Sequence, residues 1–163
     1  MTQKNKLPLR DSFDRKLTDL RISLIDQCNF RCSYCMPKEI FGKDYQFLPK
    51  KELLSFEEIK FLSNAFVNLG VEKLRLTGGE PLLRKNIPEL IYDLKKLKTL
   101  KGDNVEVTLT TNGFLLQQFT TSLKKSGLDR VTVSLDALDE NIFQEMIGGK
   151  YSPKIVLSGI DAA

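Results

Sequence analysis

The sequence contains no histidine, and its only three cysteines are Cys28, Cys32 and Cys35. No imidazole can therefore complete a metal site built on these thiols. No apolar run reaches the roughly 20 residues that a membrane-spanning helix needs, and the first residues lack the apolar stretch of a secretory signal. We therefore expect a cytoplasmic protein with no membrane partner. In that compartment thiols stay reduced, and a compact cysteine cluster indicates a metal site rather than disulfides.

The composition is that of an ordinary globular domain. The chain has 163 residues, of which 41% are hydrophobic and 28% charged. Its net charge of +4 is compatible with an anionic small molecule and is too small to indicate nucleic acid. Several basic residues lie near the start, which predicts a basic arm over residues 1–19 and one core domain over residues 20–163; these basic residues are Lys4, Lys6, Arg10, Arg15 and Lys16.

Segments typical of strands alternate with segments typical of helices. Ser55 and Glu58 form the pattern of a capping box at the start of the first helix, and Gly70 supplies its stop. Strands alternating with helices predict βα units and a parallel sheet, an α/β fold. The expected strands are 20–25, 73–77, 105–111 and 130–135, and the later helices are 86–97, 114–125, 140–147 and one that begins after Pro153.

The four expected strands alternate between apolar and polar residues. In residues 73–77, Leu74 and Leu76 share one face, whereas Arg75 and Thr77 share the other. Parallel strands covered on both faces would be apolar throughout. Two explanations remain, a half-solvated sheet or the wall of an open barrel with a polar lumen. The helices between the strands favour the barrel.

The cysteines follow the spacing C-x3-C-x2-C, with Tyr34 just before the last of them. A structural zinc site takes four protein ligands, so a carboxylate, a water or another chain would have to complete it. A thioredoxin-like reading of Cys32 and Cys35 leaves Cys28 unexplained. A 4Fe–4S cluster with one iron free of protein ligands accounts for the number, the spacing and the missing fourth ligand together.

This motif resembles that of the radical S-adenosylmethionine (SAM) enzymes, and Gly78-Gly79-Glu80-Pro81 resembles their GGEP motif at the end of the second strand. The resemblance implies that three thiolates hold three irons and that the fourth iron binds SAM. One-electron reduction then cleaves SAM to a 5′-deoxyadenosyl radical. Physically, two glycines at the end of a strand let a backbone approach a ligand closely.

From about residue 9 onward the chain resembles the GTP 3′,8-cyclase family of molybdenum cofactor biosynthesis. The residues that carry this resemblance include Arg75-Leu76-Thr77-Gly78-Gly79, Leu109-Thr110-Thr111-Asn112-Gly113 and Val133-Ser134-Leu135-Asp136. Membership implies a lyase that converts GTP to the cyclic precursor of pyranopterin, with a 4Fe–4S cluster and SAM as cofactors. It also implies an electron donor, which the sequence does not identify.

The resemblance implies a binding role for nine residues. It implies no catalytic residue other than those that hold the cofactors. The cluster ligands would be Cys28, Cys32 and Cys35; the SAM contacts would be Tyr34, Gly79 and Ser134; the GTP contacts would be Arg21, Arg75 and Thr110. Independently of the family, the three GTP contacts and Ser134 fall on the polar face of the expected sheet. Arginine suits phosphate because its planar fork donates two parallel hydrogen bonds.

The chain departs from this family after its fourth expected strand. The family has six βα units and a C-terminal region with a second three-cysteine cluster that binds guanine, but no cysteine follows Cys35. We therefore expect an incomplete (β/α) barrel of about four units, the N-terminal portion of such an enzyme, with no complete turnover alone. Alternatives are another radical SAM enzyme, such as a peptide-modifying member, and a non-enzymatic metal-binding protein. Homo-oligomer formation is left open.

Overall fold

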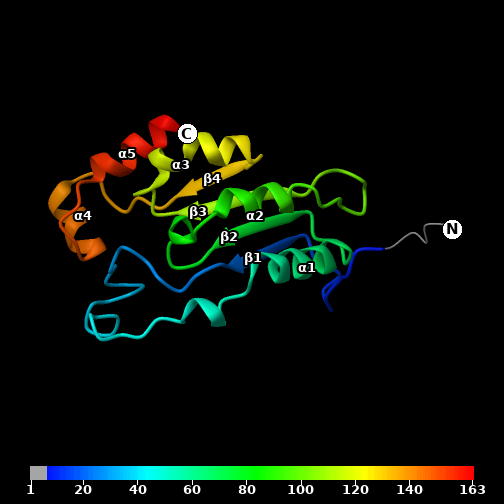
Figure 1. Ribbon diagram of the computed structural model, residues 1–163, viewed down its shortest axis with the longest axis horizontal. Helices are drawn as coiled ribbons and strands as arrows, with labels where there is room; N and C mark the ends of the chain where they lie inside the picture. Colours follow the sequence, from blue (N-terminus) through cyan, green and yellow to red (C-terminus); the bar gives the residue numbers. More distant parts are fainter. Residues whose placement is uncertain (1–6) are drawn as a thin grey trace.

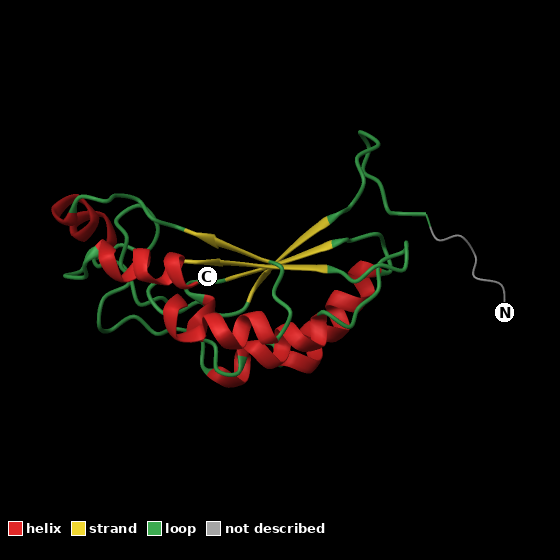
Figure 2. Ribbon diagram, turned by 90° about the horizontal axis from the view of Figure 1, so that it is seen from above, coloured by secondary structure: helices red, strands yellow, loops and turns green. Residues whose placement is uncertain are grey.

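The computed structural model describes residues 7–163 and shows a four-stranded parallel sheet with helices against one face (Figures 1 and 2). The strand order is β1-β2-β3-β4, so consecutive strands are neighbours, and the sheet does not close on itself. The elements are β1 (Asp19–Ser23), η1 (Lys50–Glu52), α1 (Phe56–Val67), β2 (Lys73–Thr77), η2 (Pro81–Leu83), α2 (Ile87–Leu94), β3 (Glu106–Thr111), α3 (Leu116–Lys125), β4 (Arg130–Val133), α4 (Glu140–Ile147) and α5 (Pro153–Ala162).

The expected α/β fold with an incomplete parallel barrel is confirmed. The helices α1, α2 and α3 each connect one strand to the next parallel strand, as crossover connections must. The predicted capping box is present: the Glu58 amide donates to Ser55 Oγ at 3.1 Å, and the Ser55 amide donates to Glu58 Oε2 at 2.7 Å. These bonds satisfy two amides that the first turn would leave without partners.

Several elements are shorter than the sequence predicts. The first strand ends at Ser23 rather than at residue 25, and the last ends at Val133 rather than at residue 135. One more ladder bond follows each, from the Leu24 amide to Thr77 O and from the Ser134 amide to Thr111 O, both 2.9 Å. Beyond these bonds the regular ladder ends, although Ile25 O still accepts a hydrogen bond from the Gly79 amide after β2. Likewise, α2 covers 87–94 within the expected 86–97, and α3 begins at residue 116 rather than 114.

The apolar face of the sheet lies under the helices, as the alternation predicts. Leu74, Leu76, Val107 and Leu109 are fully buried. They form one core with the inward residues of three helices; those residues are Ile59 and Val67 of α1, Ile87, Leu90, Ile91 and Leu94 of α2, and Leu116 and Leu123 of α3. Fully burying one such side chain contributes about 1.5–3 kcal/mol, so this face supplies most of the stability of the fold.

The opposite face carries the polar residues and has no helix over it (Figure 2). Arg21 of β1 and Thr132 of β4 are exposed, and Arg75 of β2 is half-buried. Thr108 of β3 departs from this pattern, because it is only 2% exposed and its hydroxyl has no hydrogen-bond partner. In the strand register Thr108 lies between Arg75 and Arg130, two long side chains that flank a short one.

The segment before β1 is tied to the rest of the fold. The Leu9 amide donates to Leu69 O at 2.7 Å, and Arg10 pairs with Lys16 in an antiparallel bridge. Lys4 and Lys6 of the expected basic arm lie outside the described residues. Within residues 7–163, no helix is long and apolar enough to cross a membrane.

Candidate metal centre and ligand site

The three cysteines lie in the loop that follows β1, at the carboxyl ends of the parallel strands. The loop is fastened to α4, because the Arg31 amide donates to Ile147 O at 2.9 Å and the Ser33 amide donates to Met146 O at 3.2 Å. The Arg31 guanidinium holds the loop from within by donating to three backbone oxygens at 2.7–2.8 Å, those of Cys28, Phe30 and Phe41. Sequence reasoning missed Arg31, since nothing local to it indicates these bonds.

All three thiols line one cavity of about 290 Å³. Cys28 and Cys32 are half-buried, Cys35 is exposed, and none of them forms a disulfide. In the described part of the chain, no three Cys, Asp or Glu side chains are grouped closely enough to hold a single ion. In a cube of iron and sulfide each thiolate binds a different iron, and three cysteines that line one cavity fit that arrangement.

Two polar side chains of the segment that carries Cys28 also suit a bound group, and one of them, Asp26, lines this cavity. Asn29 Nδ2 and Asp26 Oδ1 are buried and have no hydrogen-bond partner, although Asp26 Oδ2 accepts from the Leu48 amide at 2.7 Å. An unsatisfied buried donor is costly and is expected where a ligand supplies the acceptor. Burial also raises the pKa of the Cys28 and Cys32 thiols, so binding iron there releases protons.

The predicted glycine loop packs directly against the approach to the cysteines. A Cβ on Gly79 would meet Gln27 O at 2.2 Å, and one on Gly78, whose φ is +150°, would meet Ile25 O at 2.5 Å. The Gly79 amide donates to Ile25 O at 2.7 Å. Both glycines also line the cysteine cavity. We expected the two glycines to allow a ligand to approach closely. In the structure the group that approaches them closely is the backbone of residues 25–27.

Glu80 is fully buried and joins the ends of β2 and β3. Its carboxylate accepts hydrogen bonds from the Thr111 hydroxyl at 2.7 Å, the Asn112 amide at 2.8 Å and the Leu82 amide at 3.0 Å. Burial raises the pKa of Glu80, and these three donors oppose that rise. Beyond it, Asn112 Nδ2 lies 3.7 Å from Cys28 Sγ. The sequence places Glu80 and Asn112 in strand-end motifs but does not show that they meet.

The predicted SAM contacts Tyr34, Gly79 and Ser134 lie around the cysteine loop. The Tyr34 hydroxyl donates to Asp136 Oδ2 at 2.8 Å, which joins the cysteine loop to the segment after β4. Burial and this bond raise the pKa of Tyr34 well above its usual range. Ser134 directly follows β4 and is exposed, and its amide pairs with Thr111 O.

The predicted GTP contacts lie on the open polar face. Arg21 and Arg75 are direct partners on β1 and β2, and Thr110 lies on β3, two residues beyond the position opposite Arg75. Arg75 is 3.6 Å from Asp19 Oδ2. Arg21 has no ion pair within the described residues. Asp19 thus pairs with Arg75 and not with Arg21, so the two neighbouring guanidiniums leave this part of the face locally positive.

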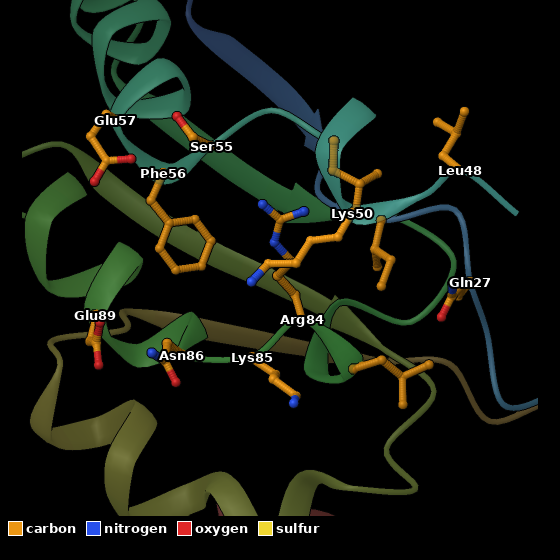
Figure 3. A pocket seen from close by; sticks show the side chains of 13 residues that line it. Gln27, Leu48, Lys50, Ser55, Phe56, Glu57, Arg84, Lys85, Asn86 and Glu89 are labelled. Carbon is orange, nitrogen blue, oxygen red and sulfur yellow. The ribbon is translucent and has the colours of Figure 1, made fainter.

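A larger cavity, of about 490 Å³, shares Ile25 with the cysteine cavity and is also lined by Gln27, just before Cys28 (Figure 3). Lys50 and Phe56 reach into it, with the Arg84 guanidinium between them and 5.3 Å from the Phe56 ring (Figure 3). Arg84 is occupied by the backbone oxygens of residues 24 and 54, at 3.2 and 2.6 Å. Glu57 and Glu89 also line this cavity, and no sulfur does. The three candidate thiolate ligands therefore lie in the smaller cavity.

A parallel sheet of βα units with three cysteines in the loop at its carboxyl end is the arrangement that we expected of a radical SAM enzyme. The family model described as the radical SAM superfamily matches residues 22–163, and the chain belongs to that superfamily. Among curated relatives, a GTP 3′,8-cyclase of Staphylococcus epidermidis is 48% identical over 155 residues, covering 95% of this chain and 44% of the relative. One from Acidothermus cellulolyticus is 51% identical over 156 residues, covering 96% and 42%. The chain thus spans less than half the length of these relatives.

Solved structures share the fold. Streptococcus suis SuiB bound to S-adenosylmethionine matches with a TM-score of 0.62 and 22% identity, covering 86% of this chain and 30% of SuiB. HydG, a maturase of the [FeFe]-hydrogenase, matches with a TM-score of 0.68 and 18% identity, covering 90% and 32%. At these identities the likeness shows the fold alone. The match to the radical SAM superfamily supports a 4Fe–4S cluster and SAM as cofactors.

Proposed function

We propose that this chain forms the part of a GTP 3′,8-cyclase that holds the 4Fe–4S cluster and SAM and that offers the first contacts to GTP. One observation carries the proposal. The cavity that contains all three thiols opens at the carboxyl end of a sheet whose polar face carries two neighbouring arginines, in a chain 48–51% identical to enzymes of that name. The same proposal makes residues 20–163 the radical SAM core, residues 1–19 a basic arm, and the cytoplasm its location.

In this proposal Cys28, Cys32 and Cys35 hold three irons of the cluster. When bound, the cluster supplies the electron that cleaves the sulfonium bond of SAM to give a 5′-deoxyadenosyl radical. An external one-electron donor, whose identity is open, provides that electron. The buried Asn29 amide nitrogen, which has no hydrogen-bond partner, and the cavity that all three cysteines line support this role.

We further propose that Tyr34, Gly79 and Ser134 orient SAM. All three stand at the carboxyl ends of the strands, and the Tyr34–Asp136 hydrogen bond holds the cysteine loop against the segment that carries Ser134. A ligand between them would contact β2, β4 and the cysteine loop at once. Such contacts from several elements fix orientation, which is the chief requirement for a radical that must reach one hydrogen.

Arg21, Arg75 and Thr110 would bind GTP through its phosphates. Arg21 lacks an ion pair in the described chain, and the Arg75–Asp19 pair is partly exposed and therefore weak, so a triphosphate can replace the carboxylate. Each arginine can donate two parallel hydrogen bonds to one phosphate. The chain covers 44% of its relative, so further GTP contacts can come from the remainder of such an enzyme.

The test is the binding of GTP to the anaerobically reconstituted chain with SAM, followed by product analysis. Arg75→Ala should weaken GTP binding about tenfold, the value of a lost charge-assisted hydrogen bond, and should leave iron content unchanged. Lys125→Ala removes an exposed cation from α3, on the helix-covered side of the sheet, and is the control. Loss of the cluster with unchanged GTP affinity would refute the assignment. Binding of a peptide in place of GTP would favour another radical SAM reaction.

A further inference from the structure

The Cys28 sulfur has two N–H donors directed at it. The Phe30 amide lies 3.4 Å from Sγ and Asn112 Nδ2 lies 3.7 Å from it. The first donor belongs to the cysteine loop itself and is a backbone group. The second comes from the end of β3, 84 residues away in the chain, and is a side chain that a single substitution can remove.

The Asn112 side chain is fixed from several sides. Its Oδ1 accepts from the Phe114 amide at 3.0 Å, and its Nδ2 also donates to Asn29 Oδ1 at 2.8 Å. Its own backbone amide donates to the buried carboxylate of Glu80 at 2.8 Å. The amide group is therefore held beside Cys28 by the fold before any ligand binds. A donor held in advance loses little entropy when a thiolate forms opposite it.

A second side-chain amide, that of Asn29, contacts the Asn112 amide. Asn29 Nδ2 is buried and has no partner among residues 7–163. Asn29 Oδ1 accepts from Asn112 Nδ2 at 2.8 Å, so the residue next to Cys28 in the sequence helps to hold the Asn112 amide in place. Asn112 is thus the side chain that directs an N–H group at a cysteine sulfur, and the chain offers no histidine that could do so.

Hydrogen bonds to cluster sulfurs are one of the means by which a protein sets the reduction potential of an iron–sulfur cluster. Each N–H carries a partial positive charge toward the sulfur. Reduction adds one electron, taken from an external donor, and breaks no bond to the protein. The reduced cluster carries more negative charge, so an N–H donor stabilises it more than the oxidised cluster.

We propose that Asn112, paired with Asn29 and anchored on Glu80, is a positioning residue that raises the reduction potential of the cluster bound through Cys28. This inference rests on the cluster proposed above and goes beyond it, since it assigns a redox role to an amide that ligates nothing. It predicts that removing the Asn112 amide makes the cluster harder to reduce without removing a ligand.

The test is a dithionite titration of the reconstituted chain with redox mediators, followed by electron paramagnetic resonance. Asn112→Ser keeps an oxygen for the Phe114 amide but is too short to reach Cys28, and it changes no charge. Asn112→Leu is a second neutral variant that also excludes water from the position. Asn64→Leu, an exposed change on α1, is the matched control. Both Asn112 variants should shift the midpoint to more negative potential at unchanged iron content, and the control should match the parent.

Equal midpoints in the parent and both Asn112 variants would overturn the inference while leaving the cluster proposal intact. Loss of the cluster from both variants would also overturn it, because Asn112 would then retain the cluster rather than tune it. Failure of the parent chain to take up iron and sulfide would instead refute the proposed function, so the two failures are distinguishable.

Discussion

The two faces of the sheet are built from the same strands and do opposite things. Leu74 and Leu76 of β2 are fully buried under α1, α2 and α3, whereas Arg75 between them faces the open side and remains partly exposed. The apolar face stabilises the fold, and the polar face offers charge to a ligand. In these parallel strands, period-two alternation therefore assigns alternate residues to two tasks: the apolar ones stabilise the fold, and the polar ones are available to bind a ligand. Substitutions should therefore separate the two effects.

The largest effect should come from the cysteine loop. Cys32→Ser removes one of three protein ligands, so iron content should fall from about four per chain to near zero. The apo chain should unfold at nearly the same urea concentration, because Cys32 contributes little to the main core. Iron and sulfide assays and urea denaturation measure the two quantities. Ser33→Ala, next to it, is the control. A variant that keeps a full complement of iron would contradict the ligand assignment.

On the apolar face, Leu76→Ala should lower the free energy of unfolding by about 2–5 kcal/mol, since it leaves a cavity in the core. Thr132→Ala on the exposed polar face should change it by less than about 1 kcal/mol. Urea denaturation of the apo chain compares the two. Equal losses at both positions would mean that the faces are not separated as the structure indicates.

Tyr34→Phe removes the hydroxyl that donates to Asp136 and keeps the ring. We expect SAM affinity to fall a few-fold, because the cysteine loop loses a tie to the segment after β4; a hydrogen bond to a charged group contributes about 1.5–3 kcal/mol when buried and less when exposed, as here. Isothermal titration of the reconstituted chain with SAM measures this. Tyr92→Phe, on the exposed side of α2, is the control, and an unchanged affinity for SAM in Tyr34→Phe would argue against the tie.

The smallest effect should be a pH dependence at Glu80. Burial raises the pKa of Glu80 above that of an ordinary glutamate, so the folded state binds a proton more readily than the unfolded state. The contribution of Glu80 to stability is therefore largest at low pH and falls as the pH rises from the unfolded pKa through the raised folded pKa. In Glu80→Gln this fall should disappear. Unfolding of both proteins at several pH values tests it, and parallel curves would contradict the raised pKa.

Much of the fold could be predicted because its signals are local. The capping box of Ser55 and Glu58, the alternation in 73–77 and the cysteine spacing each occupy a few neighbouring residues. The ends of elements were less predictable, since β1 stops where its partner β2 stops and not where its own apolar pattern stops.

The connections within the site could not be predicted from the sequence. The chain of contacts from Glu80 to Asn112 to Cys28 joins three segments far apart in the sequence, and only the parallel register brings them together. The burial of Thr108 also depends on neighbours across the sheet. The glycine motif correctly indicated a close backbone approach at Gly79. The group that approaches is the Gln27 backbone, which leaves no room for a Cβ and which no local pattern indicates.

The most direct test of the central claim is electron paramagnetic resonance of the anaerobically reconstituted, dithionite-reduced chain, recorded with and without SAM. We predict about four irons and four sulfides per chain, and a reduced 4Fe–4S signal that shifts when SAM binds the iron that no cysteine ligates. A chain that takes up no iron–sulfur cluster, or a cluster signal that SAM leaves unchanged, would contradict the account.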